Sequence, residues 1–166
     1  MKGVRILEHV KQMLEPVFDE NSEVLILGTF PSVKSREVEF YYGNPQNRFW
    51  KVISAITGNN EYESIDEKKK MLLDNKIALW DTIESCDITG SSDSSITNVA
   101  PADLSVILNN SKIKKIYANG YKAYKLYNKY SLKSTNIDII KLPSTSPANA
   151  RFKLEKLIEI WSSILE

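Results

Sequence analysis

Residues 24–32 read VLILGTFPS, a short run of apolar side chains that closes on a glycine and a proline. Such a run, bounded by turn residues, is typical of a strand that is buried on both faces of a sheet. Three further runs have the same character: IALWDT at 77–82, IKKIYANG at 113–120 and IDIIKLP at 137–143. We therefore predict a core of four buried strands.

Helical segments are expected between and around these strands. Asn47 and Ser64 stand where helix N-caps belong, and Ser64 with Glu67 forms a capping box. Gly58 is a plausible helix stop, and Pro101 a plausible helix start. The expected helices cover 4–16, 49–58, 64–75, 101–109, 121–130 and 150–165, and the long loops cover 30–46 and 84–100.

The alternation of strands and helices predicts the fold class. It indicates a three-layer α/β/α sandwich with a central four-stranded parallel sheet. A chain of 166 residues fits a single domain, which we place at 1–166. Ligands of such sheets bind beyond the carboxyl ends of the strands. We therefore look for functional residues directly after positions 29, 82, 119 and 142.

The composition excludes several classes of protein. Cys86 is the single cysteine and His9 the single histidine, so neither a disulfide framework nor a zinc module built on these residues is expected. The glycine patterns of dinucleotide-binding and P-loop proteins are absent from the sequence. The first residues lack the apolar region of a signal peptide, and no apolar run has the length of a membrane span. We expect an intracellular protein that has no membrane partner.

Positive charge is concentrated in one segment, although the net charge is only +1. Residues 112–141 contain eight lysines and one acidic residue, Asp138, with tyrosines placed between the lysines. A basic, aromatic-rich face suits a nucleic-acid backbone, and Lys122 and Lys125 are the candidates for that contact. A solvated helix face above packed tyrosines explains the same pattern, and the charge run by itself favours this second explanation.

The segments at the four predicted strand ends resemble the uracil-DNA glycosylase superfamily, and within it the hypoxanthine-DNA (deoxyinosine) glycosylase family. The resemblance covers about residues 22–165 and is carried by VLILGTFPSVKS, EFYYGNPQNRFW, ALWDTIESCD, IYANG and LPSTSPANA. It implies a uracil-DNA glycosylase-like fold and hydrolysis of the N-glycosidic bond of a deaminated base that is flipped out of damaged DNA. It also implies that no metal or organic cofactor is needed. We expect a monomeric cytoplasmic enzyme that associates with the nucleoid when it acts on DNA.

Two positions depart from the superfamily pattern. The opening loop of relatives carries an Asp or Asn that positions water, and Phe30 stands there in this chain. The final motif of relatives begins with His, and here the residue is Leu142. The resemblance therefore passes the water-positioning role to amides: Asn47 first, Asn44 second, and Asn119 as a further catalytic candidate. Local chemistry alone also allows an N-cap at Asn47 and turns at Asn44 and Asn119.

The remaining candidates fall into a base pocket and a DNA-contact set. Phe30 is expected to wall or stack on the base, or to be an ordinary core residue. Tyr41 and Tyr42 are expected to stack on the base or close the pocket floor. Asp81 is expected to accept from the ring N–H of hypoxanthine or uracil, or else to cap its loop. The expected DNA contacts are Arg48, Ser144, Thr145, Ser146, and Asn149 and Arg151 at the start of the last helix.

Three alternatives remain open at this point. The departures at Phe30 and Leu142 allow a weakly active or inactive relative that only binds lesions. Uracil or mismatched thymine competes with hypoxanthine as the excised base. A small-molecule α/β enzyme is the third alternative, although the absent nucleotide-binding motifs count against it.

Overall fold

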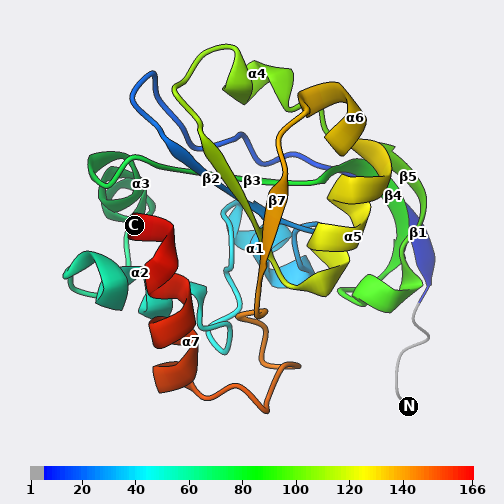
Figure 1. The fold of residues 1–166 in the computed structure, drawn as a ribbon. Coiled ribbons are helices and arrows are strands. Elements are labelled where there is room, and N and C mark those ends of the chain that lie inside the picture. Colours follow the sequence, from blue (N-terminus) through cyan, green and yellow to red (C-terminus); the bar gives the residue numbers. More distant parts are fainter. Residues whose placement is uncertain (1–5) are drawn as a thin grey trace.

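The computed structural model describes residues 6–166 and contains the predicted parallel sheet of four strands (Figure 1). The strand order is β3 (Ile77–Asp81), β2 (Val24–Gly28), β6 (Lys115–Asn119) and β7 (Ile139–Leu142). Every neighbouring pair is parallel. The carboxyl ends of all four strands therefore meet at one edge of the sheet, as the sequence predicts.

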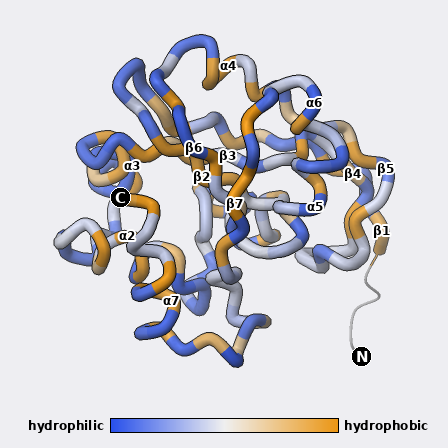
Figure 2. Tube along the Cα trace, in the orientation of Figure 1, coloured by the Kyte–Doolittle hydropathy of each residue, from blue (hydrophilic) through white to orange (hydrophobic). Residues whose placement is uncertain are grey.

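Helices cover both faces of this sheet (Figure 1). One face carries α2 (Phe49–Thr57), α3 (Ile65–Asp74) and α7 (Leu154–Trp161), and the other carries α4 (Ser105–Leu108), α5 (Tyr121–Tyr130) and α6 (Leu132–Thr135). Ile26 packs toward the first group, whereas Leu25 and Leu27 pack toward the second. The strand needs apolar residues at every position because both of its faces are covered, and Figure 2 shows hydrophobic residues gathered on the inner elements.

A second, antiparallel sheet is not expected from the sequence. It consists of β1 (Leu7–Lys11), β4 (Ile83–Thr89) and β5 (Thr97–Pro101), in the order β1-β4-β5, and the 3-10 turn η1 (Asp93–Ser95) lies between β4 and β5. The prediction of a loop over 84–100 is therefore wrong. Cys86 and Ile88 alternate with polar residues as in a strand, but register shifts in the β4–β5 pairing break the period of two that would reveal it.

The predicted helix over 4–16 is also wrong, and its residues 4–5 lie outside the described part of the chain. The segment forms β1, which pairs along its whole length with β4. Its apolar side chains do not form a buried helical stripe, because Leu7 is 56% exposed and Met13 is 82% exposed. Pairing with an open strand edge outweighs the weak helical pattern. His9 therefore lies on a strand, with Nδ1 at 2.7 Å from Asp87 Oδ1.

Three smaller boundaries differ from the predictions. The loop over 30–46 contains a short helix, α1 (Val33–Val38), whose N-cap is Ser32. Pro101 ends β5 instead of opening a helix, and α4 begins at Ser105, where Asp103 accepts from its backbone N–H. The last helix begins at Leu154 and ends in the 3-10 turn η2 (Ser162–Leu165). No helix among residues 6–166 combines the length and the apolar content needed to cross a membrane.

Candidate active site

A cavity of about 510 Å³ lies at the carboxyl edge of the parallel sheet. It brings together the three candidate amides, the aromatic candidates Phe30, Tyr41 and Tyr42, and the carboxyl of Asp81. These residues come from four separate stretches of the chain. The cavity is lined by Gly28, Thr29, Phe30, Pro31, Ser32, Lys34, Ser35, Tyr41, Tyr42, Asn44, Asn47, Asp81, Ser91, Ser92, Asp93, Ser94, Asn119, Ser144, Thr145, Ser146, Pro147 and Ala148.

Asp81, the last residue of β3, provides a buried carboxyl on this cavity. It is 4% exposed, and its Oδ2 accepts from Gln12 Nε2 at 2.8 Å. Gln12 Oε1 in turn accepts from the backbone N–H of Leu14 at 2.8 Å, which fixes how the amide is turned. Burial raises the pKa of Asp81 to about 7, the Gln12 hydrogen bond acts to lower it, and the charge of Asp93 adds to the rise.

Gly28, at the end of β2, makes room for two functional groups. A Cβ built on Gly28 would lie 2.5 Å from Asp81 Oδ1 and 2.9 Å from the Tyr42 hydroxyl oxygen. Tyr42 adopts a φ of 53°, and its ring stacks on Phe49 with centroids 4.0 Å apart. Burial raises the pKa of Tyr42, and the neighbouring carboxylate of Asp81 acts in the same direction. The Tyr42 hydroxyl therefore keeps its proton, because burial disfavours the phenolate.

A chain of hydrogen bonds connects three of the strand ends and their loops. Asn119 Nδ2 donates to the Tyr42 hydroxyl at 3.1 Å and to Thr145 Oγ1 at 3.0 Å, and Asn119 Oδ1 accepts from the Thr145 backbone N–H at 3.0 Å. Thr145 Oγ1 then donates to Asn47 Oδ1 at 2.8 Å. Both ends of the Asn119 amide are thus occupied by protein groups, which makes it an organiser of the site.

Asn47 and Asn44 lie on the loop that enters α2. Asn47 Oδ1 also accepts from the Phe49 backbone N–H at 2.9 Å, so this oxygen receives two hydrogen bonds and serves the helix start. The N-cap position itself belongs to Arg48, whose side chain makes no capping bond. Asn44 Oδ1 accepts from the Gln46 backbone N–H at 2.9 Å and retains a second lone pair. The group of Asn47 that is not engaged by these bonds is Nδ2.

Arg48 is bonded to the protein itself, which argues against the phosphate contact predicted from its sequence position. Its side chain donates to the backbone carbonyls of Thr145, Ser146, Asn149 and Phe152. All four carbonyls belong to residues 143–153, the segment between β7 and α7 that we call the closing loop. The guanidinium donates these hydrogen bonds to the closing loop and so holds it against the start of α2.

The closing loop corrects two more predictions. Thr145 is fully buried within the hydrogen-bond chain and cannot reach a DNA phosphate. Asn149 and Arg151 precede the last helix by several residues, and Asn149 Nδ2 donates to the Ser144 carbonyl at 3.0 Å. Ser144 and Ser146 are half-buried and line the cavity, and Arg151 is exposed.

The aromatic candidates are built into the cavity wall. Phe30 is 8% exposed and packs with β4 and β5 residues, so it is at once a core residue and a wall of the cavity. Tyr41 is 3% exposed, and its hydroxyl donates to the Glu15 carbonyl at 2.7 Å. Burial raises the pKa of Tyr41, so its hydroxyl is also a neutral group.

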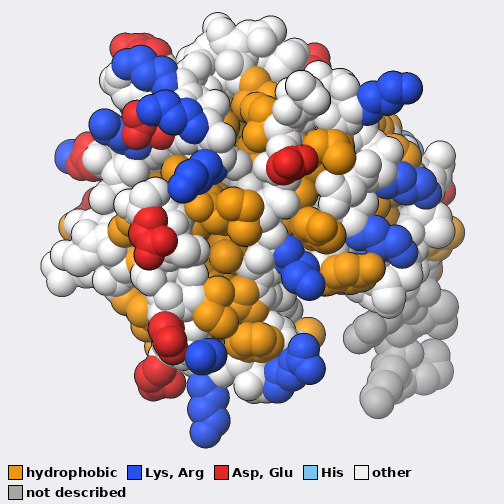
Figure 3. All heavy atoms as spheres, viewed as in Figure 1, with side chains coloured by type: hydrophobic (Ala, Val, Ile, Leu, Met, Phe, Trp, Pro, Cys, Tyr) orange, Lys and Arg blue, Asp and Glu red, His pale blue; other side chains and the backbone are white. Residues whose placement is uncertain are grey.

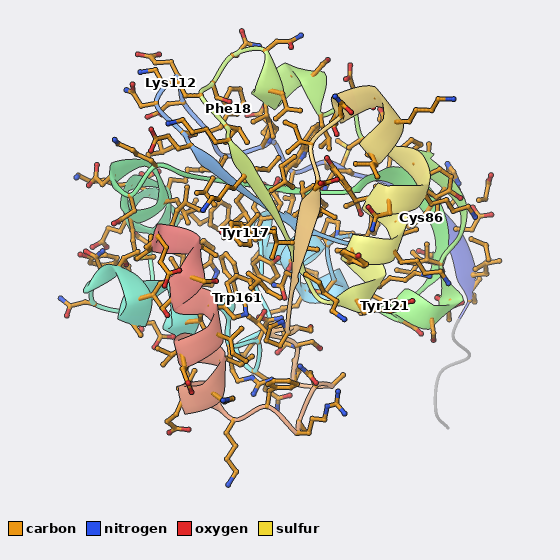
Figure 4. The ribbon with its side chains drawn as sticks, in the orientation of Figure 1. Phe18, Cys86, Lys112, Tyr117, Tyr121 and Trp161 are labelled. Atoms are coloured by element: carbon orange, nitrogen blue, oxygen red, sulfur yellow. The ribbon has the colours of Figure 1, made fainter. Side chains whose placement is uncertain are left out.

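A second cavity of about 500 Å³ adjoins the first and shares with it Thr29, Asp93, Asn119, Ser144, Ser146 and Ala148. Cations line it: Lys122 at the start of α5, Lys141 on β7 and Arg151 in the closing loop. Tyr121, 63% exposed at the first turn of α5 (Figure 4), also lines it, with Lys141 Nζ 5.5 Å from its ring centre. Figure 3 shows lysine and arginine side chains over α5 and the closing loop. Lys125 is exposed on α5 outside both cavities.

Sequence reasoning misses several residues of the site. The sequence pattern places Gln12 in a helix far from any strand end, and only the pairing of β1 with β4 brings this residue to Asp81. The cavity rim formed by Ser91, Ser92, Asp93 and Ser94 has the composition of a connecting loop. Lys34 lies in a segment without a period, so no pattern points to it. Within residues 6–166, no three His, Cys, Asp or Glu side chains cluster as metal ligands would.

Comparison with known proteins identifies the family to which the chain is similar. The family model described as "Uracil DNA glycosylase superfamily" matches residues 15–165. A protein from Methanosarcina acetivorans named hypoxanthine DNA glycosylase is 36% identical over 159 residues, covering 93% of this chain and 98% of that protein. A protein of the same name from Methanosarcina barkeri is 34% identical over 116 residues, covering 68% of this chain and 73% of that protein. The solution NMR structure of a proposed uracil DNA glycosylase from M. acetivorans superposes with a TM-score of 0.79 at 36% identity, covering 93% of this chain and 96% of that one.

Proposed function

The chain belongs to the uracil-DNA glycosylase superfamily, and from this membership we propose that it excises hypoxanthine from DNA by hydrolysing the N-glycosidic bond. The observation that carries the proposal is the convergence of Asn44, Asn47, Asp81 and Tyr42 on one cavity at the carboxyl edge of the sheet. The choice of hypoxanthine is supported by the names of the two relatives. A nucleotide must leave the base stack to enter such a cavity, because the scissile bond is inaccessible within a duplex.

We assign the attacking water to the space between Asn47 and Asn44. Asn47 Nδ2 is free to donate to the water oxygen, and Asn44 Oδ1 has a lone pair that can accept one of the water hydrogens. The transition state of glycosidic cleavage is cation-like at the sugar, so a weakly activated but well-oriented water is sufficient. The Asn119–Thr145 bonds support this arrangement by fixing Asn47 Oδ1.

We assign base recognition to Asp81, Tyr42 and Phe30. The carboxyl of Asp81 is a buried polar group on the cavity, and both it and the Tyr42 hydroxyl lie close to Gly28. Phe30 supplies an apolar wall for the face of the base. Hypoxanthine N1–H and uracil N3–H offer the same kind of donor to polar groups of the cavity, so these residues do not by themselves fix the base, and the preference has to be measured.

We assign the DNA strand to the second cavity. Lys122, Lys141 and Arg151 line it with three positive charges against the one carboxyl of Asp93, and Ser144 and Ser146 connect it to the base cavity. Lysine and arginine side chains that contact phosphates supply affinity without reading sequence. The monomeric state and the nucleoid-associated location remain predictions of the sequence.

The test is a base-release panel. Duplex and single-stranded oligonucleotides that carry one hypoxanthine, uracil, xanthine or mismatched thymine are incubated with the protein, and abasic sites are cleaved with alkali. We expect cleavage at hypoxanthine, reduced at least a hundredfold in Asn47→Ala and in Asn44→Ala. Release of uracil or thymine in preference to hypoxanthine would reassign the substrate. Binding to all lesions without base release would mean that the protein is an inactive relative that only binds DNA lesions.

A further inference from the structure

The amide of Gln12 is locked in one orientation. Its Oε1 accepts from the Leu14 backbone N–H, so its Nε2 must be the group that faces Asp81 Oδ2. An amide N–H can only donate, and Oδ2 is therefore held as an acceptor whether or not the carboxyl carries a proton. The carbonyl oxygen of a carboxylic acid is its stronger acceptor, so this bond favours a proton on the other oxygen, Oδ1.

The Oδ1 atom of Asp81 is the carboxyl oxygen that faces the cavity. It sits against Gly28, which lines the cavity, and none of residues 6–166 donates a hydrogen bond to it. The Asp81 side chain is 4% exposed, and its removal from bulk water favours the protonated form of the carboxyl. The titratable groups that face it are the Tyr41 and Tyr42 hydroxyls and the Asp93 carboxyl, and the cation on the same cavity is Lys34.

We propose that Asp81 acts in its protonated form as the proton donor to the departing purine, and that Gln12 is the positioning residue that keeps this proton on the cavity side. The inference rests on the proposed function. It gives the chain a donor to the leaving base at a site where Leu142 cannot supply one. The pKa of Asp81, raised to about 7 by burial, makes the protonated form abundant near neutral pH.

The step balances without a further reactant. The bond between C1′ of the sugar and N9 of hypoxanthine breaks, and its electron pair passes to the purine. The proton on Asp81 Oδ1 moves to N7 of the purine, which leaves as the neutral base. The oxygen of the water held by Asn47 and Asn44 bonds to C1′, and the proton that it loses returns through solvent to the Asp81 carboxylate.

The first test is Asp81→Asn, because Gln12 also dictates how the new amide is turned. Its oxygen must face Gln12 Nε2, so its NH₂ group faces the cavity as a permanent donor that cannot transfer a proton. We expect the single-turnover rate constant of the unsubstituted protein on deoxyinosine to fall about tenfold per pH unit above pH 7. We expect Asp81→Asn to retain a rate lowered about 10- to 100-fold that is flat from pH 6 to pH 9.

The second test is Gln12→Leu. Loss of the Gln12 hydrogen bond removes an effect that lowers the pKa of Asp81, so the alkaline limb of the rate profile should move to higher pH. A purely structural role of Gln12 would lower the rate equally at every pH. Met13→Ala is the matched control, since this neighbouring side chain is 82% exposed, and its profile should equal that of the unsubstituted protein.

The outcomes separate this inference from the proposed function. A rate that rises through pH 7, together with complete loss of activity in a folded Asp81→Asn protein, would identify Asp81 as an ionised acceptor and overturn the inference while deoxyinosine cleavage stands. If uracil is the released base, the same profiles are measured on uracil. If no base is released between pH 5 and pH 9, the proposed function fails and the inference fails with it. Circular dichroism confirms that each variant is folded.

Discussion

Gly28 is the residue on which the geometry of the base cavity depends most directly. A Cβ at this position would overlap Asp81 Oδ1 at 2.5 Å and crowd the Tyr42 hydroxyl at 2.9 Å. We predict that Gly28→Ala displaces both groups and lowers the rate of base release at least a hundredfold, because small displacements at a reacting centre are costly. Single-turnover cleavage of a deoxyinosine duplex measures the effect.

The matched control for this substitution is Gly58→Ala. Gly58 has a φ of 70°, and a Cβ added to it would have no neighbour within 4 Å, so alanine there adds backbone strain without touching the cavity. It should cost about 1 kcal/mol of stability and leave the rate unchanged. If Gly28→Ala is fully active, the positions of the Asp81 carboxyl and the Tyr42 hydroxyl do not depend on the missing Cβ of Gly28.

Thr145 is predicted to act through Asn47. Its hydroxyl donates to Asn47 Oδ1 and accepts from Asn119 Nδ2, so Thr145→Val removes one hydrogen-bond partner from each of these two amide groups. We expect about a tenfold or greater fall in the single-turnover rate with little change in DNA affinity, and recovery in Thr145→Ser, which restores the hydroxyl. Equal impairment of the serine and valine variants would mean that the methyl group matters instead.

At the scale of single residues, the sequence predicts the chemistry of the cavity better than its bonding. The amides at 44, 47 and 119 and the carboxyl of Asp81 are expected at strand ends, and the cavity brings them together. The role of Thr145 and the contact of Gln12 with Asp81 are not predictable from spacing, since each joins segments far apart in the chain. Hydrogen-bond partners of this kind are set by tertiary pairing.

At the scale of elements, the closing loop is held by Arg48 and by Trp161, whose Nε1 donates to the Pro143 carbonyl at 3.0 Å. We predict that Arg48→Ala frees this loop, because the carbonyls of Ser146 and Asn149 lose the donor that ties them to the start of α2 and keep only donors from within the loop. Amide hydrogen exchange in residues 143–153 should rise, and DNA affinity should fall about tenfold. The slope of log affinity against log salt concentration should not change, because Arg48 contacts no phosphate.

Arg151→Ala provides the contrasting case for this element. Arg151 is exposed beside the second cavity, so its loss should reduce the salt slope by about one while leaving exchange in the closing loop unchanged. A reduced salt slope in Arg48→Ala without a change in exchange would return Arg48 to the role of a phosphate contact.

The elements also show where sequence patterns succeed. The four parallel strands are predictable because burial on both faces requires continuous apolar runs, as in Leu25, Ile26 and Leu27. The antiparallel sheet is not predictable: β1 is largely exposed, and the bulged β4 lacks a clean alternation. A half-exposed edge strand has little hydrophobic pattern, so its identity depends on the partner that it finds.

At the scale of the whole molecule, the antiparallel sheet completes the candidate active site. The predicted sandwich supplies the strand ends of β2, β3, β6 and β7, while the chain leaving β1 supplies Gln12. The two sheets are joined through the chain itself, since β4 begins two residues after β3 ends. The position of the Asp81 proton is therefore tied to how the amino-terminal strand docks.

Because Asp81 is buried in the fold, its ionisation makes the free energy of unfolding of the domain depend on pH. The pKa of Asp81 is about 7 in the fold and near its ordinary value of 3.8 in the unfolded chain. Below pH 4 both states hold the proton; between pH 4 and pH 7 only the folded state does, so its stability falls as the pH rises, and above pH 7 the loss is complete.

Asn cannot ionise, so Asp81→Asn should gain stability relative to the unsubstituted protein as the pH rises, by on the order of 2–4 kcal/mol between pH 4 and pH 8. Urea unfolding at both pH values measures this difference. Asp138→Asn is the control because Asp138 is exposed, and its free energy of unfolding should change with pH as that of the unsubstituted protein does. If Asp81→Asn is less stable than the unsubstituted protein at pH 8, the folded state stabilises the ionised carboxylate, and Asp81 has no proton to donate at that pH.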